Sequence, residues 1–353
     1  MRVLVCPTAF KESLGPAAVA QAMATGVLRA VPEAEVTILP VSDGGPGLLD
    51  AVRSAGGGRR ETVPARDPWG ERREAECLRL SGGEVLIEAA EANGLHLVPL
   101  SRRDPLRTDT RGVGDLIQAC VENGGDTVWV GLGGSGTVDG GSGMATVFGY
   151  RFLDARGREL SPGGGSLEAL ARIEPGWRPV ARITGLADVR SPLLGPDGAA
   201  LRFAPQKGAR PAEVERLERG LARLAECMES DLGVRVAELA GAGAAGGLGA
   251  GLAGFLGAEL QPGAAWVLDR VGLDQALITP DLVITGEGSW DPTGDLGKVV
   301  PEVIARASKS RVPVLLVCGR IVAAVPQGVR GVGGEGRWLD GADIADLVAS
   351  ALG

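Results

Sequence analysis

The sequence predicts an α/β protein in which a doubly wound parallel sheet, of the Rossmann or flavodoxin type, carries a second, mixed α/β domain inserted in it. Short β-branched runs alternate with segments of helical periodicity, which is typical of parallel sheets covered by helices. The middle of the chain instead contains hairpin-like pairs of strands, which one parallel sheet does not have. The 353 residues are enough for two domains of ordinary size.

The elements of the parallel sheet follow from local patterns. Each expected strand is a short apolar run that ends at Gly, Pro or a polar residue. The strands are residues 3–6, 36–39, 127–130, 282–285 and 314–318. Segments between and after them have apolar residues at helical spacing, and the expected helices are residues 16–30, 110–122, 299–309 and 342–352. Strand and helix therefore alternate as the doubly wound fold requires.

The middle of the chain has a different character. Residues 60–87 hold two strand-like runs around the turn Asp67-Pro68-Trp69-Gly70, and residues 151–160 predict a second hairpin that turns at 154–157. Residues 211–231 predict an amphipathic helix. We therefore expect a parallel-sheet domain of residues 1–60, 110–150 and 278–353, and an inserted mixed domain of residues 61–109 and 151–277.

Composition excludes several classes of function. The net charge of −8 argues against nucleic acid as a partner, because binding to phosphate backbones needs clustered positive charge. The five cysteines are scattered without a CxxC pattern, and the chain has one histidine, so neither a cysteine-based zinc site nor a Ser-His-Asp triad is expected. No apolar run is long enough to cross a bilayer. We expect a cytoplasmic protein with no membrane partner and a small-molecule substrate.

Lysine is rare in this chain. The 36 basic residues include four lysines, Lys11, Lys207, Lys298 and Lys309. An ammonium group is a compact point charge that arginine does not replace at every site. Positions that keep lysine in such a chain are therefore candidates for a function.

Candidate chemistry lies after the predicted strands, because open α/β sheets bind ligands at the carboxyl ends of their strands. The residues that follow four strands share a composition of glycine, acids and lysine. They include Lys11, Asp43, Gly133, Gly134, Ser135, Thr137, Gly286, Glu287, Asp291 and Lys298. Backbone N–H groups of glycine-rich loops bind phosphate oxygens, and carboxylates hold Mg²⁺ or accept a proton. This composition favours phosphoryl transfer.

The sequence lacks one of the two common nucleotide-binding motifs and matches the other only loosely. Gly297-Lys298 does not form a Walker A motif, because Val299 follows it and Pro292 stands where the first glycine belongs. The dinucleotide pattern G-x-G-x-x-G occurs at Gly131, Gly133 and Gly136, but the same pattern recurs elsewhere in this glycine-rich chain. An NAD-dependent hydroxy-acid dehydrogenase therefore stays as an alternative.

Several longer motifs occur in the same order as in a known family. Through them the chain resembles the type I glycerate kinases, of the bacterial glycerate 2-kinase group, over roughly residues 1–320. The matching segments are Phe10-Lys11-Glu12-Ser13-Leu14, Asp43-Gly44-Gly45, residues 131–143, Arg151-Phe152-Leu153-Asp154, Asp188-Val189, Pro205-Gln206-Lys207-Gly208-Ala209, residues 241–249 and Ile284-Thr285-Gly286-Glu287-Gly288. The resemblance implies two α/β domains with the active site between them, MgATP as donor, D-glycerate as acceptor and 2-phosphoglycerate as product.

The resemblance also suggests roles for the strand-end residues. Lys11 and Lys207 would neutralise the transferred phosphate or the glycerate carboxylate, and Asp188 would be the general base. Asp43 and Asp291 would bind Mg²⁺ or act as base, which leaves open which aspartate has which role. The remaining candidates would bind ATP: Gly133, Gly134, Ser135, Thr137, Gly286, Glu287 and Lys298. Asp43 and Asp188 could instead cap turns.

The chain departs from the family pattern at several positions where the family usually has polar groups. These positions hold Thr8, Ala9, Pro46, Val138, Ser289 and Thr293. Loss of charged partners for a phosphate or carboxylate weakens binding. Besides the dehydrogenase, three readings therefore stay open: an active glycerate kinase, a kinase with another substrate or reduced activity, and a homologue that binds ligand without turnover.

Overall fold

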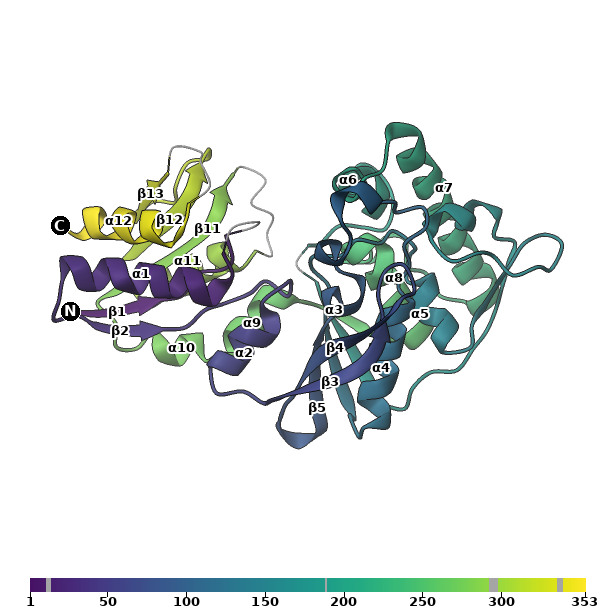
Figure 1. Cartoon of the computed structure of the whole chain (residues 1–353), viewed down its shortest axis with the longest axis horizontal. Coiled ribbons are helices and arrows are strands. Elements are labelled where there is room, and N and C mark those ends of the chain that lie inside the picture. Colours follow the sequence, from purple (N-terminus) through teal and green to yellow (C-terminus); the bar gives the residue numbers. More distant parts are fainter. Residues whose placement is uncertain (11–13, 188, 292–297, 335–338) are drawn as a thin grey trace. The chain divides into compact units, whose positions relative to one another are not determined.

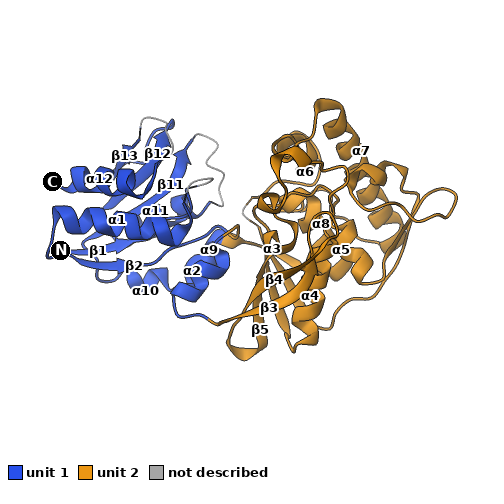
Figure 2. Ribbon diagram, viewed as in Figure 1, with its two compact units in different colours: residues 1–43, 47–57, 264–353 blue, residues 44–46, 58–263 orange. Residues whose placement is uncertain are grey.

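The computed structural model describes residues 1–10, 14–187, 189–291, 298–334 and 339–353. The chain divides into two compact units, shown in separate colours in Figure 2. Unit 1 comprises residues 1–43, 47–57 and 264–353, and unit 2 comprises residues 44–46 and 58–263. No helix in the described part of the chain is both long and apolar enough to span a bilayer.

Unit 1 is built on a five-stranded sheet with the order β13-β12-β11-β1-β2, in which every neighbouring pair is parallel. Its strands are β1 (Arg2–Val5), β2 (Glu35–Ile38), β11 (Leu282–Trp290), β12 (Val314–Ile321) and β13 (Val329–Gly333). Its helices are α1 (Pro16–Ala30), α2 (Leu48–Ser54), α9 (Gly263–Arg270), α10 (Leu273–Ala276), α11 (Val299–Lys309) and α12 (Gly341–Leu352).

Helices α1 and α12 cover one face of this sheet, where they lie side by side (Figure 1). Their apolar residues share a core with the central strands, for example Met23, Val348 and Ile284. The two helices pack closely at Gly26, where a Cβ atom would lie 2.4 Å from the carbonyl oxygen of Ala345. Pro16 at the start of α1 fits the first helical turn, which has no intrahelical partner for a backbone N–H.

Unit 2 is built on a six-stranded mixed sheet with the order β10-β9-β6-β5-β4-β3. The strands are β3 (Arg59–Arg66), β4 (Arg72–Arg79), β5 (Glu84–Glu88), β6 (Thr127–Gly131), β9 (Arg182–Ala187) and β10 (Glu259–Pro262). β3, β4 and β5 are antiparallel neighbours, and β5, β6, β9 and β10 are parallel. A separate antiparallel pair consists of β7 (Arg151–Leu153) and β8 (Arg172–Glu174).

Helices surround the sheet of unit 2 (Figure 1). They are α3 (Ala90–Asn93), α4 (Arg111–Glu122), α5 (Ser142–Val147), α6 (Ala199–Phe203), α7 (Pro211–Leu232) and α8 (Ala244–Leu256). Short 3-10 helices are η1 (Ser81–Gly83), η2 (Leu95–Leu97), η3 (Leu100–Arg102), η4 (Gly164–Ala169) and η5 (Pro205–Lys207). α4 packs directly on β3, because a Cβ at Gly112 would lie 1.8 Å from the carbonyl oxygen of Arg66.

The turn between β3 and β4 is the one expected from the sequence. Asp67 Oδ1 accepts hydrogen bonds from the backbone N–H groups of Trp69 at 2.9 Å and Glu71 at 2.8 Å. The second expected hairpin is partly different. Asp154 does organise a turn, but β7 forms its ladder with β8, and residues 153 and 159 make only an isolated bridge.

The two-domain α/β class is confirmed, but one expected strand lies in the other sheet. β6 pairs with β5 on one side and β9 on the other over all five of its residues, so it belongs to unit 2. The sequence placed residues 110–150 with the parallel sheet of residues 1–60. An apolar strand buried on both faces looks the same in either sheet, so its sequence cannot say which strands it joins.

Candidate active site

The carboxyl end of β6 in unit 2 continues into a loop, residues 132–141, that carries four of the predicted site residues. Lys207, at the end of η5, contacts this loop although it lies 72 residues beyond Ser135. Its Nζ donates hydrogen bonds to Ser135 Oγ at 2.9 Å and to the carbonyl oxygen of Thr137 at 2.8 Å. The Lys207 side chain belongs to a residue only 3% exposed. The structure therefore brings a buried positive charge against the predicted anion-binding loop.

Backbone hydrogen bonds fix the shape of the 132–141 loop. Leu95 N donates to the carbonyl oxygen of Gly134 at 2.8 Å, and Gly136 N donates to that of Asn93 at 2.7 Å. Gly134 has φ +75°, a left-handed conformation that glycine adopts without steric cost. Pro46 lies beside it, because a Cβ at Gly134 would lie 2.5 Å from Pro46 Cγ. The departure at Pro46 thus packs on the loop itself.

Asp139 anchors the far end of the loop and is fully buried. Its Oδ2 accepts hydrogen bonds from Thr110 N at 2.9 Å, Thr110 Oγ1 at 2.8 Å and Gly143 N at 3.1 Å. Its Oδ1 accepts one from Gly141 N at 3.2 Å. Burial raises the pKa of Asp139 to about 6, and the negative charge of Asp109 adds to that rise, while the hydrogen bonds from Thr110 and Gly143 oppose it. This one carboxyl joins the starts of α4 and α5 to the loop.

The glycine-rich start of α8 packs against the same loop. Gly246 has φ +70°, and a Cβ there would lie 1.9 Å from the carbonyl oxygen of Thr137. A Cβ at Gly247 would lie 2.9 Å from Gly140 Cα, and one at Gly251 would lie 2.7 Å from the carbonyl oxygen of Gly140. The glycines of residues 241–249 therefore allow a close backbone approach, and this explains the G-x-G-x-x-G pattern that begins at Gly241 without a dinucleotide.

Replacing Gly246 with alanine should lower the free energy of unfolding more than the same replacement at another glycine of left-handed conformation. Gly233 also has φ +70°, but nothing lies within 4 Å of a Cβ at that position. Gly233→Ala is expected to cost about 1–2 kcal/mol of folding free energy from strain alone. Gly246→Ala adds the collision with Thr137, about 1–3 kcal/mol more. Denaturant unfolding of the two variants measures the difference, and equal losses would show that the close approach at Gly246 is unimportant.

Unit 1 carries the second set of predicted residues, at the carboxyl edge of its own sheet. Gly286 and Glu287 lie on β11, where they pair with Val317 and Cys318 of β12. A Cβ at Gly286 would lie 1.9 Å from the carbonyl oxygen of Val317, so glycine is required for this strand pairing. The backbone N–H of Thr8 donates to the Gly286 carbonyl oxygen at 3.1 Å.

Asp291 and Lys298 flank the end of β11 and the start of α11. Lys298 Nζ lies 4.0 Å from Asp291 Oδ1, and both side chains are partly exposed. Asp43 follows β2 and is joined by one peptide bond to Gly44, whose carbonyl oxygen accepts a hydrogen bond from Gly133 N at 3.3 Å. In the parts of the chain that the structure describes, no three histidine, cysteine or acidic residues gather as a metal site. Lys11 and Asp188, predicted as charge neutraliser and base, lie outside the described residues.

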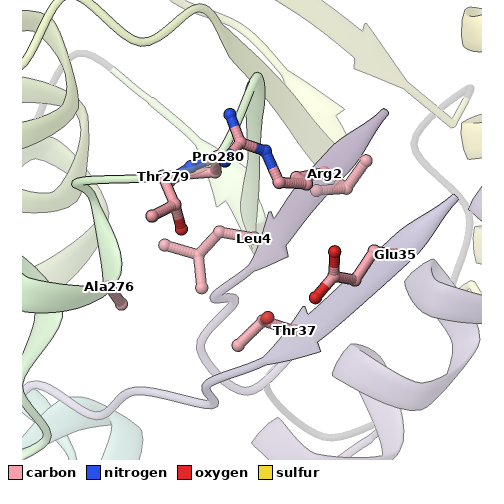
Figure 3. A pocket seen from close by; sticks show the side chains of 8 residues that line it. Arg2, Leu4, Glu35, Thr37, Ala276, Thr279 and Pro280 are labelled. Carbon is pink, nitrogen blue, oxygen red and sulfur yellow. The ribbon is translucent and has the colours of Figure 1, made fainter.

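A small pocket of unit 1 lies elsewhere and contains none of the predicted residues (Figure 3). It is lined by residues from the starts of β1 and β2 and from the segment before β11, among them Arg2, Glu35 and Thr279. Arg2 is held there by an ion pair with Asp281 at 3.1 Å. Ligands of open α/β sheets bind at the opposite, carboxyl ends of the strands, so this pocket is not a candidate.

Known proteins of similar sequence indicate the family to which this chain belongs. The sequence profile described as the Glycerate kinase family matches residues 3–333. The chain belongs to the glycerate kinase family. It is 40% identical over 326 residues to a glycerate kinase of Halalkalibacterium halodurans, covering 90% of this chain and 85% of that protein. It is also 40% identical to the glycerate 2-kinase of Escherichia coli K12, covering 91% of this chain and 86% of that protein.

A solved structure of the glycerate kinase family agrees with the fold. The crystal structure of a protein from Salmonella typhimurium LT2, described as glycerate kinase 2, has a TM-score of 0.81 and 36% sequence identity, and the match covers 100% of this chain and 97% of that one. Glycerate kinases are ATP-dependent phosphotransferases, so the predicted family and enzyme class are confirmed. Membership also favours a kinase over the dehydrogenase alternative drawn from Gly131, Gly133 and Gly136.

Proposed function

We propose that this protein transfers the γ-phosphoryl group of ATP to a hydroxyl group of D-glycerate and forms 2-phosphoglycerate. The observation that carries the proposal is the buried contact of Lys207 with Ser135 and Thr137 on the loop after β6. Phosphoryl transfer needs mainly positioning and neutralisation of charge, and an ammonium fixed on a glycine-rich loop contributes to both. The names of the relatives support glycerate as the acceptor.

Residues of this chain can take each of the roles that the reaction requires. The acceptor oxygen bonds to the γ-phosphorus as the bond from that phosphorus to the bridging oxygen of ADP breaks. The hydroxyl proton passes to a carboxylate, for which Asp188 is the first candidate and Asp43 the second. Lys207 and Lys11 hold the anionic oxygens of phosphate or carboxylate. Gly133, Gly134, Ser135, Thr137, Gly286, Glu287 and Lys298 would contact ATP.

The candidate carboxylates suit Mg²⁺, which usually enters a kinase bound to ATP. Mg²⁺ is commonly held by one or two carboxylates together with phosphate oxygens and waters, so a cluster of three acidic residues is not needed. Asp43 and Asp291 would supply these carboxylates. Bound Mg²⁺ would neutralise charge on the phosphates of ATP.

We place the enzyme in the cytoplasm, with a small hydroxy acid and no nucleic acid or membrane as partner. All five cysteines in the described part of the chain are buried free thiols, as is usual in a reducing compartment.

An assay with purified protein, MgATP and D-glycerate tests this proposal. ADP release measures turnover. Enolase added without phosphoglycerate mutase identifies the product, because enolase acts on 2-phosphoglycerate and not on 3-phosphoglycerate. We expect ADP release and a direct enolase signal. Turnover that needs mutase for that signal would contradict phosphorylation at the 2-hydroxyl, and thermal stabilisation by ATP without turnover would favour a non-catalytic homologue. An absorbance change of nicotinamide with a hydroxy acid would favour the dehydrogenase.

A further inference from the structure

Asn93 lies beside the 132–141 loop at the end of α3, directly after the carboxyl end of β5, and is 0% exposed. Its side-chain Nδ2 donates a hydrogen bond to Thr137 Oγ1 at 3.1 Å. Its backbone carbonyl oxygen accepts one from Gly136 N at 2.7 Å. Asn93 therefore holds two consecutive residues of the loop, one through its backbone and one through its side chain.

Thr137 is held from two sides by different residues. Asn93 binds its hydroxyl group, while Lys207 Nζ binds its carbonyl oxygen at 2.8 Å. The amide nitrogen of Asn93 and the ammonium of Lys207 can only donate, so Thr137 serves as the acceptor in both contacts. The position of the Lys207 ammonium therefore depends on where Asn93 holds Thr137.

The other side-chain atom of Asn93 argues against a purely structural role. Its Oδ1 is buried and has no hydrogen-bond partner in the described parts of the chain. An unpaired buried acceptor is unfavourable to folding, and an apolar side chain of similar size would avoid that cost. The fold therefore gains no hydrogen bond from one of the two polar atoms of this side chain.

We propose that Asn93 is a positioning residue, which fixes Thr137 so that Lys207 points its charge at the reacting anionic oxygens. This inference rests on the proposed function. Asn93→Leu removes the amide while keeping a similar side-chain volume. We expect kcat to fall about tenfold with the KM for ATP and for D-glycerate nearly unchanged, since the lost contact acts through a charge used in the transition state. The melting temperature should change little.

A double-mutant cycle with Thr137→Val separates positioning from general damage. Thr137→Val removes the hydroxyl that Asn93 binds and keeps the carbonyl that Lys207 binds, so Asn93→Leu should cause no further loss in that background. Thr137→Ser keeps the hydroxyl and should keep most of the activity. Thr184→Val is the matched control, because Thr184 Oγ1 is also buried without a partner among the described residues but lies within β9, away from the loop. It should leave kcat unchanged.

The cycle is measured on turnover and on the dissociation constant of ATP determined by calorimetry. Additive losses of kcat in the cycle, a loss of ATP affinity in Asn93→Leu that accounts for its lower turnover, or an Asn93→Leu enzyme that loses stability but keeps kcat, would overturn the positioning role. A wild-type protein that binds ATP but does not phosphorylate D-glycerate would overturn the proposed function, and with it a role that acts through kcat. Normal turnover of the wild type together with an unchanged kcat of Asn93→Leu would overturn the positioning role alone. A wild-type protein that neither binds ATP nor turns over would overturn both.

Discussion

Replacing Lys207 with methionine is expected to lower kcat/KM by at least about a hundredfold while leaving the fold intact. The ammonium makes two hydrogen bonds to the loop, at 2.9 Å to Ser135 Oγ and 2.8 Å to the Thr137 carbonyl oxygen. These bonds fix the position of the ammonium, and the rate effect comes from the hydrogen bonds that it gives to the anionic oxygens of phosphate or carboxylate. Each such hydrogen bond of a charged group contributes about 1.5–3 kcal/mol, and two of them are expected. Since about 1.4 kcal/mol corresponds to a tenfold change in rate, loss of the charge should exceed two orders of magnitude.

The stability of the Lys207→Met protein distinguishes catalysis from folding. Methionine leaves Ser135 Oγ and the Thr137 carbonyl oxygen without this donor, which costs about 1–3 kcal/mol, while the cost of desolvating the ammonium disappears. We therefore expect a folded protein of somewhat lower stability. Steady-state kinetics and a thermal melt on the same preparation measure both effects. A variant that keeps more than half of wild-type activity would remove Lys207 from the proposed mechanism.

Two further lysine variants complete this test. Lys207→Arg keeps the charge but places a larger, planar guanidinium in a site that is 3% exposed, so it should not restore activity. Lys309→Met changes the exposed lysine at the end of α11 and should have no effect on turnover. Activity in the arginine variant close to that of the wild type would show that any positive charge suffices.

Replacing Asp139 with alanine is expected to have the largest effect on stability, more than about 3 kcal/mol. Four donors in the buried site lose their acceptor, namely the backbone N–H groups of Thr110, Gly141 and Gly143 and the Thr110 hydroxyl. A buried donor without a partner costs about 1–3 kcal/mol. In a chain of this size the melting temperature should fall by roughly 6–12 °C. Differential scanning calorimetry measures this shift.

The contribution of Asp139 to the stability of the fold should also depend on pH, and it should decrease as pH rises, unlike that of an aspartate whose pKa is lowered by folding. Burial, and to a lesser extent the negative charge of Asp109, raises the pKa of Asp139 in the folded state to about 6, above the ordinary value of an aspartate. The folded state therefore binds the proton more tightly than the unfolded state, so stability from this group is fullest below about pH 4 and declines as pH rises to about 6. The stability difference between wild type and Asp139→Ala should shrink over that range.

Asp154 is a control, because its contribution to stability should depend on pH in the opposite direction. Its pKa is lowered by hydrogen bonds from the Arg158 backbone and side chain, so its contribution is present above its unfolded pKa and is lost as pH falls. The difference between wild type and Asp154→Ala should therefore shrink toward low pH. Equal slopes for the two aspartates in urea unfolding at several pH values would contradict the raised pKa of Asp139.

Local patterns in the sequence predicted the elements well, because each pattern depends on residues close in the chain. α1 and α11 have the expected bounds, residues 16–30 and 299–309, and the five expected strands are present. The placement of β6 could not be predicted, because its pairing with β5 and β9 depends on long-range partners. The rarity of lysine made Lys207 a candidate; the structure describes its contacts, and its role stays a prediction.

The supporting residues of the loop were missed for a related reason. Asn93 lies 44 residues from Thr137, and Asp139 lies 29 residues from Thr110, so neither hydrogen bond has a local signature. An aspartate in a glycine-rich segment was a signal, but its full burial was not visible. The roles of Lys11 and Asp188 remain predictions from the resemblance.

The order of strands in unit 1 has a consequence for synthesis on the ribosome. β1 is an inner strand that pairs with β2 and also with β11, whose residues follow it by about 280 positions, as in the pairing of Val3 with Leu282. Unit 2 is almost continuous in residues 58–263, so most of it leaves the ribosome before β11 is made. Since domains generally fold as they emerge, the contact between Ser135 and Lys207 can form before β11 has been made and can pair with β1. The newly made chain would then carry a folded unit 2 together with an unpaired edge of β1 until the last quarter of the chain is translated.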